Sequence, residues 1–139
     1  MSEDRMPPAS ADWKTMVVEG YPALIGPFQA RREGEAWAYR FVPEARHLNI
    51  GGVVHGGMLM SFLDDVLGLT VWAASGRKPV TTVQLNTHFI SPARLGDQLE
   101  GRADVLRATR SVVFVRGALT VEGRIVAAAD GVWKILGAS

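Results

Sequence analysis

The sequence predicts an α+β domain in which an antiparallel sheet is wrapped around one long central helix. Residues 56–75 form an almost unbroken apolar segment, long enough for a helix of about 30 Å. After this segment apolar and polar residues alternate, and the connections are too short to contain crossover helices. A buried helix covered by antiparallel strands is the simplest packing of these segments.

The first part of the chain carries weaker patterns. Residues 1–10 are predicted to form a disordered tail, ahead of a single domain over residues 11–139. Ser10 and Asp12 are residue types that cap helix N-termini, so a short helix over residues 13–17 is expected.

Two strands and the long helix follow. Residues 28–32 and 36–42 are predicted strands, joined by a turn at Glu33 and Gly34. The helix at residues 56–75 is apolar on almost every side, which predicts that it is buried rather than amphipathic.

The second half of the chain is predicted to be all strand. Val83, Leu85 and Phe89 alternate with polar residues, which is typical of a strand with one buried face. A turn is expected at Glu122 and Gly123. The same alternation marks three further segments, residues 98–105, 113–121 and 125–136.

A loop with polar side chains and paired glycines precedes the helix. Asn49 and His55 lie in this loop, which ends at Gly56 and Gly57. Glycine lets the backbone approach a ligand closely, and a helix that begins here points free N–H groups outward at the positive end of its dipole. Such a helix start can hold a carbonyl oxygen whose negative charge grows during a reaction.

The order His-x-Asn-x-x-Gly-x-x-His-Gly-Gly at residues 47–57, with Asp64 nine residues after His55, resembles a known enzyme family. This family is the hotdog-fold acyl-CoA thioesterases, specifically the PaaI-like, phenylacetate-pathway branch of the 4-hydroxybenzoyl-CoA thioesterase superfamily. The pattern Ser-Pro-x-x-x-Gly-Asp at residues 91–97 also resembles a turn of that family. The resemblance covers about residues 20–136, and it implies the hotdog fold and hydrolysis of aryl-acyl or medium-chain acyl-CoA thioesters.

The resemblance also implies a mechanism. The backbone N–H of Gly56 would donate to the thioester oxygen, and Asp64 would be the nucleophile or the general base. In this family the site forms across a dimer interface, so Asp64 of one chain would face Gly56 of the other. A homo-oligomer is therefore expected, most of all a homotetramer built as a dimer of dimers.

Asp65 competes with Asp64 for the role of the reactive carboxylate. Neighbouring helical residues point about 100° apart, so only one of the two can face a given site. The spacing from His55 favours Asp64. The alternative is that one carboxylate bonds a neighbouring loop while the other lies in solvent.

Each of the remaining polar residues has two alternative interpretations. His55 could orient the loop or contact the thioester, whereas His47 is expected to be held by backbone hydrogen bonds. Asn49 is expected to hold the catalytic water or the loop, with ordinary turn chemistry as the alternative. Thr82 lies where relatives place a Ser or Thr beside the carboxylate or the water. If Val83 faces the helix, strict alternation turns Thr82 away, so the role of Thr82 depends on the strand start or on a neighbouring subunit.

Coenzyme A brings phosphates, for which arginine is a suitable partner. The residues predicted to bind substrate and CoA are Gly57, Arg94, Arg107, Arg110 and Ser111. The arginines occupy two turns near the expected mouth of the pocket, and a solvated surface position is an equal alternative for each. Met58, Phe62 and Trp72 could line the acyl pocket, although core packing is the better prediction at helical spacing.

The composition excludes several classes of function. A net charge of +1 argues against a nucleic-acid partner, and the apolar run is interrupted by acidic residues, which argues against a membrane span. The absence of cysteine excludes disulfides and thiolate sites. No metal or cofactor is expected beyond the CoA of the substrate, because His47 and His55 do not have a recognised ligand spacing. The N-terminal residues lack the pattern of a signal peptide, so a cytoplasmic location is expected.

Two other functions remain as alternatives. A hydratase or dehydratase acting on acyl-CoA or acyl-carrier protein shares the fold, but such relatives place their His and Asp on a differently spaced loop. A non-catalytic acyl-CoA-binding module would be expected to carry a DNA-binding segment, and the residues before Trp13 show no basic block. A Ser-His-Asp hydrolase has no support, because a Gly-x-Ser-x-Gly motif does not occur.

Overall fold

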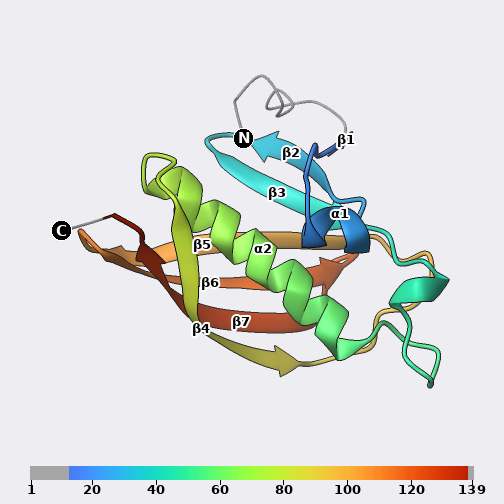
Figure 1. The fold of residues 1–139 in the computed structure, drawn as a ribbon. Coiled ribbons are helices and arrows are strands. Elements are labelled where there is room, and N and C mark those ends of the chain that lie inside the picture. The colour runs from blue at the N-terminus through green and yellow to red at the C-terminus, as the bar shows by residue number, and fades with distance from the viewer. Residues whose placement is uncertain (1–12, 138–139) are drawn as a thin grey trace.

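The computed structural model describes residues 13–137 and has the predicted architecture (Figure 1). One antiparallel sheet of seven strands has the order β1-β2-β3-β5-β6-β7-β4, and helix α2 lies across one of its faces. The strands are β1 (Lys14–Thr15), β2 (Gln29–Glu33), β3 (Ala36–Phe41), β4 (Val80–Phe89), β5 (Leu99–Ala108), β6 (Val112–Val121) and β7 (Arg124–Ile135). The helices are α1 (Tyr21–Ile25), the 3-10 helix η2 (Ala45–His47) and α2 (Gly56–Ala74).

The helix expected over residues 13–17 is wrong, because this segment contains the short strand β1. Lys14 pairs with Ala30 of β2, and the N–H of Met16 donates to the carbonyl of Phe28 at 2.8 Å. Met16 is buried in the core, so tertiary pairing and burial outweigh the local capping signals. The expected caps at positions 10 and 12 and the expected tail at residues 1–10 lie outside the described residues.

Helix α2 spans the predicted segment but is not buried on all sides. Its buried side chains recur every three or four residues and form one stripe against the sheet. They are Met58, Leu59, Phe62, Leu63, Val66, Leu67 and Val71. On the other side Met60 is exposed, so part of the apolar surface of this helix is left uncovered. By length and hydropathy α2 would also pass as a membrane-spanning helix, but in this fold it is the core helix of the sheet.

Strand β4 forms one edge of the sheet and contains a β-bulge. The register with β7 shifts between Thr82 and Gln84, so Val83 is an extra residue. The extra residue reverses the alternation, and both Thr82 and Leu85 therefore face α2. The prediction that Val83 and Phe89 are buried is wrong, since they are 62% and 55% exposed.

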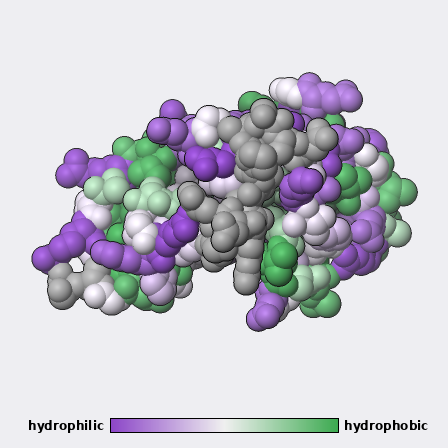
Figure 2. Space-filling view, turned by 90° about the horizontal axis from the view of Figure 1, so that it is seen from above, coloured by the Kyte–Doolittle hydropathy of each residue, from purple (hydrophilic) through white to green (hydrophobic). Residues whose placement is uncertain are grey.

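The strands after β4 agree with the predicted alternation. Leu99, Val113 and Leu119 are fully buried under α2, and the predicted turn at Glu122 and Gly123 joins β6 to β7 with both residues at positive φ. The face seen from above carries hydrophilic and hydrophobic side chains interspersed in its coloured part (Figure 2). Helix α2 thus packs against the sheet and contacts its edge strand β4.

Candidate active site

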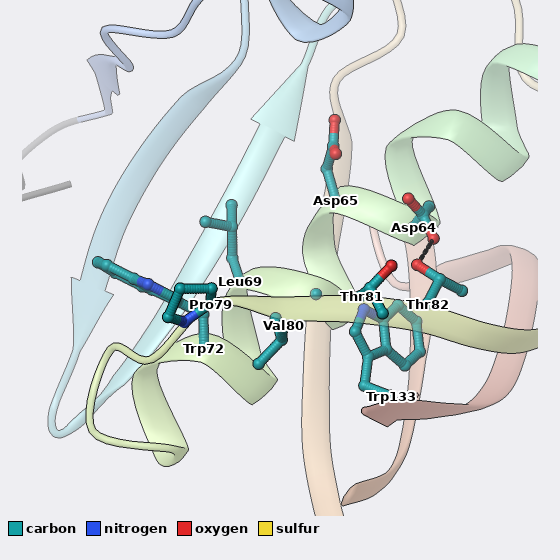
Figure 3. A pocket seen from close by; sticks show the side chains of 10 residues that line it. Asp64, Asp65, Leu69, Trp72, Pro79, Val80, Thr81, Thr82 and Trp133 are labelled. Carbon is teal, nitrogen blue, oxygen red and sulfur yellow. Dashed lines mark hydrogen bonds between the residues drawn. The ribbon is translucent and has the colours of Figure 1, made fainter. Parts of the chain in front are cut away.

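A cleft of about 520 Å³ lies between the middle of α2 and the first half of β4 (Figure 3). It is lined by Asp64, Asp65, Gly68, Leu69 and Trp72 from α2, by Pro79, Val80, Thr81 and Thr82, and by Trp133 from β7. Aromatic and aliphatic side chains therefore surround two carboxyl groups. An apolar cleft with a few polar groups is the usual form of a small-molecule site.

Asp64 is held by a short hydrogen bond. Thr82 Oγ1 donates to Asp64 Oδ1 at 2.6 Å, as the dashed line in Figure 3 marks. The bulge at Val83 makes this contact possible, because it turns Thr82 toward α2. The bond fixes one carboxylate oxygen and leaves the other oxygen of Asp64 for a substrate or a water molecule.

Asp65 leaves the helix in a different direction and has a different environment (Figure 3). Its Oδ2 atom is buried and has no hydrogen-bond partner among residues 13–137. Burial, and to a lesser degree the charge of Asp64, raise the pKa of Asp65 from 3.8 to about 7. The two neighbouring carboxyl groups are therefore not equivalent in the cleft.

The start of α2 is capped by His55. The Nδ1 atom of this side chain accepts a hydrogen bond from the N–H of Gly57 at 2.8 Å, so Nδ1 carries no proton. The N–H of Gly57, predicted as a substrate contact, is thus occupied. The N–H of Gly56 has no acceptor among residues 13–137 and is the free donor at this helix end.

Asn49 shapes the loop that leads to the helix. Its Oδ1 atom accepts hydrogen bonds from the N–H groups of Gly51, at 2.8 Å, and Val53, at 3.2 Å. This is the turn chemistry considered as the alternative, and only the side-chain amide nitrogen of Asn49 is left for another partner.

Both ring nitrogens of His47 are occupied by hydrogen bonds, as expected. Its Nδ1 accepts from the N–H of Glu44 at 2.9 Å, and its Nε2 donates to the carbonyl of Ile25 at 2.6 Å. The ring is buried and ties η2 to the end of α1. Within residues 13–137 no group of three or more metal-ligating side chains could hold a metal ion.

The helix start and the carboxylate are far apart within one chain. Gly56 and Asp64 are separated by eight residues of α2, or about 12 Å along the helix axis. A single thioester carbonyl cannot contact both groups at that distance. The helix start with Gly56 and the cleft with Asp64, here called half-sites, are therefore separate within one chain.

The predicted CoA contacts divide between the same two places. Arg94 lies in the turn beside the loop before α2, because the N–H of Val54 donates to the carbonyl of Ala93 at 2.8 Å. Arg107, Arg110 and Ser111 lie at the opposite end of the sheet, about 30 Å away along β5. Within one chain the structure does not bring the three arginines together.

The turn between β5 and β6, which contains Arg110 and Ser111, lies beside the cleft. The N–H of Ile135 donates to the carbonyl of Ser111 at 2.8 Å, and the N–H of Leu136 donates to that of Pro79 at 2.9 Å. Because Pro79 lines the cleft, Arg110 and Ser111 are close to its outer end.

Six residues of the cleft were not found from the sequence, among them Trp133 and Gly68. Trp133 gives no signal, because a tryptophan in an alternating strand is typical of a core. Gly68 does give one, because a glycine inside an apolar helix usually has a packing reason. A Cβ atom at Gly68 would lie 3.2 Å from Nε1 of Trp133, so the glycine lets this ring approach the helix. Met58 and Phe62 are core residues as predicted, whereas Trp72 lines the cleft.

Comparison with known proteins identifies one family. Residues 51–128 match the thioesterase superfamily. A Pseudomonas aeruginosa protein whose name describes it as a candidate esterase is 33% identical over 116 residues, 81% of this chain and 85% of that protein. Acyl-coenzyme A thioesterase 13 of Homo sapiens is 28% identical over 86 residues, 60% of this chain and 61% of that protein.

Solved structures agree with the fold. A candidate thioesterase from Ralstonia eutropha, described as related to phenylacetic acid degradation, superimposes with a TM-score of 0.67 at 31% identity, covering 88% of this chain and 84% of that chain. A Bacillus halodurans protein crystallised with CoA superimposes with a TM-score of 0.66 at 25% identity, covering 70% of each chain. The sheet and helix described above are thus those of the hotdog fold.

Proposed function

The chain belongs to the thioesterase superfamily and is a thioester hydrolase, and on this premise we propose that it hydrolyses aryl-acyl or medium-chain acyl-CoA to the free acid and CoA. The observation that carries the proposal is the Asp64 carboxylate, which is hydrogen-bonded to Thr82 in a cleft lined by Trp72 and Trp133. The similarity to an acyl-CoA thioesterase and to a protein crystallised with CoA supports the carrier. The proposal keeps the cytoplasmic location expected from the sequence, and no cofactor apart from the CoA of the substrate.

In the proposed reaction Asp64 is the nucleophile or the general base. Thr82 holds one oxygen of Asp64, so the other oxygen can attack the thioester carbon or take a proton from water. The N–H of Gly56 stabilises the negative charge on the carbonyl oxygen, an effect worth about 10²–10³ in rate. His55 and Asn49 act by fixing the loop and the helix start that present this N–H.

Two copies of the chain build each complete site in this proposal. Because about 12 Å along α2 separates them, Gly56 and Asp64 of one site come from different chains in this proposal. The edge of β4 is available for such an interface, since its exposed side chains include Val83 and Phe89. We expect a dimer as the minimal active unit and a dimer of dimers as the full assembly.

The proposed site made from two chains also brings the predicted CoA-binding residues together. Arg94 accompanies Gly56, whereas Arg110 and Ser111 accompany the cleft that contains Asp64. A site made from two chains brings one Arg94 turn to one β5–β6 turn, with Arg107 beside it. The guanidinium groups would then bind the phosphates of one CoA molecule.

A panel of acyl-CoA thioesters tests the proposed function. The panel contains acetyl, hexanoyl, octanoyl, benzoyl and phenylacetyl thioesters, with release of the free thiol as the measurement. Aryl and medium-chain substrates should give the highest kcat/KM, because the tryptophan-lined cleft gains most from burying them. The proposal is contradicted if the wild type hydrolyses none of them, or if it only hydrates an enoyl-CoA.

A further inference from the structure

The cleft contains a second carboxyl group for which the proposed reaction has no task. Asp64 and Asp65 line the same cleft but leave α2 in different directions (Figure 3). Asp64 is bonded to Thr82, whereas Oδ2 of Asp65 is buried without a partner. A buried carboxyl oxygen without a donor is costly as a carboxylate and far less so as a neutral acid.

The surroundings of Asp65 favour its neutral form. Asp64 is the other ionisable residue that lines the cleft, and its charge opposes ionisation of Asp65. β4 contributes the uncharged Thr81 and Thr82, and β7 contributes Trp133. On the side of α1, Tyr21 bonds Ser61, one turn before Asp65, with its hydroxyl group. Burial and the neighbouring charge place the pKa of Asp65 at about 7, so it keeps a proton in slightly acidic solution.

We propose that Asp65 is the general acid of this site and gives its proton to the thioester sulfur as the C–S bond breaks. The proposal rests on the thioesterase function above and adds a residue to it. Two neighbouring carboxyl groups whose environments favour opposite protonation states are the usual arrangement of a base and an acid. The expectation that only one of the two can face the site is wrong, because both line the cleft although neighbouring helical side chains point about 100° apart. Each can therefore act on a different atom of the substrate.

The steps balance in protons and electrons. Asp64 takes a proton from water, and the water oxygen bonds to the carbonyl carbon. When the C–S bond breaks, its electron pair goes to sulfur, and the proton of Asp65 makes the free thiol. Asp64 then holds a proton and Asp65 holds none, and exchange with water restores both. If Asp64 attacks the carbonyl carbon directly, sulfur leaves in the first step and receives the same proton. Water then attacks the acyl carbon of the resulting anhydride and gives its proton to Asp65, which releases the free acid and restores the Asp64 carboxylate.

Thioesters that share one acyl group and differ in their thiol test the proposal. Phenylacetyl esters of N-acetylcysteamine and of 4-nitrothiophenol are suitable, because the first thiolate is a poor leaving group and the second needs no proton. Asp65→Asn should lower kcat/KM for the first ester about tenfold, below the usual range for general acids because thiolates leave fairly well. The second ester should be almost unaffected. Asp104→Asn, an exposed site on the outer face of the sheet, is the control and should change neither value.

An equal loss for both esters, or no loss for either, overturns the role of Asp65 and leaves the proposed function intact. Failure of the wild type to hydrolyse any acyl-CoA thioester of the panel contradicts the proposed function itself. If Asp65→Asn does not fold, the pH dependence of the wild type tests the proposal. Its kcat/KM for the N-acetylcysteamine ester should fall above about pH 7, whereas that for the 4-nitrothiophenyl ester should not. The same decline for both esters overturns the proposal.

Discussion

The start and the middle of α2 are built in different ways. At the start, the polar groups of the loop are bonded to backbone a few residues away, as for Asn49 with Gly51 and His55 with Gly57. In the middle, Asp64 depends on Thr82, which is 18 residues later in the chain, and Asp65 has a buried oxygen without a partner. The helix start is therefore shaped locally, and the cleft is shaped by the tertiary structure.

This difference indicates how the two half-sites divide the chemistry. The loop is a preformed donor, because its own hydrogen bonds leave the N–H of Gly56 unoccupied. The cleft supplies two carboxyl groups, and burial raises the pKa of one of them, Asp65, to about 7.

The largest effect is expected from Asp64→Asn. The change keeps the size of the side chain and its contact with Thr82, but it removes the charge that attacks the thioester or accepts a proton. The value of kcat should fall at least about 10²–10³-fold with the fold intact. Steady-state assays with circular dichroism as the folding control measure this. Normal turnover in Asp64→Asn together with a complete loss in Asp65→Asn would show that the reactive carboxylate is Asp65.

Gly56→Pro removes the proposed donor at the helix start. Proline is well tolerated at the first position of a helix, and the extended backbone of His55 suits a following proline. The value of kcat should fall about 10²–10³-fold through loss of one N–H. Gly56→Ala keeps the N–H and brings a similar contact with Phe89, so it measures the steric part alone. Equal losses in both variants would exclude a role for the N–H.

Mixing Asp64→Asn with Gly56→Pro tests whether the half-sites come from different chains. Each variant alone should be nearly inactive. After joint unfolding and refolding, half of the dimers are mixed, and each mixed dimer has one intact site, so about a quarter of the wild-type activity should return. Activity that stays at the level of the separate variants would place both groups in one chain. Size-exclusion chromatography of the mixture confirms that dimers have formed.

Asp65→Asn should stabilise the folded protein in neutral and alkaline solution. The pKa of Asp65 rises from 3.8 to about 7 on folding, so the folded state binds more protons between these values. Stability of the wild type therefore falls as the pH rises from 3.8 to about 7, and the penalty persists above that range. Each unit is worth about 1.4 kcal/mol, so the variant should gain up to a few kcal/mol at pH 8. Urea denaturation at pH 4 and pH 8 measures this gain, and an equal effect at both values would contradict it.

The smallest effects are expected from the arginines. Arg94→Ala, Arg107→Ala and Arg110→Ala should each raise KM for CoA thioesters about threefold to tenfold, as expected for contacts of about 1 kcal/mol. The value of kcat should change less, because phosphate contacts act similarly in the ground and transition states. N-acetylcysteamine esters, which lack the phosphates, are the control and should show no increase. An effect of Arg94 alone, or of the β5–β6 turn alone, would place CoA at one end of the sheet only.

Much of the fold could be predicted from the sequence, because it depends on local patterns. The apolar segment at residues 56–75 and the alternation after it correspond to α2 and to β5, β6 and β7. Strand β1 could not be found in this way, because two residues have too little pattern and their partners lie in β2. For α2 the sequence overestimated burial, since Met60 on the side that faces away from the sheet is exposed.

Only part of the candidate site could be predicted from the sequence. The spacing of His55 and Asp64 predicted a donor at the start of α2 and a carboxylate in its middle, because residues on one helix keep fixed positions. The contact of Thr82 with Asp64 contradicts strict alternation and requires the bulge at Val83, which arises from pairing with β7. Trp133 could not be assigned to the cleft, because its position depends on the strand order of the sheet.

The sequence by itself determined helix α2 and the strands after it, the free N–H at the start of α2 and the carboxyl groups in its middle. These follow from hydrophobic periodicity, helix capping and helical spacing, which act over a few residues. Only the tertiary structure decided which carboxyl group is bonded and which is buried without a partner, and which aromatic residues form the cleft. Burial and long-range pairing join residues far apart in the chain, and no local pattern records them.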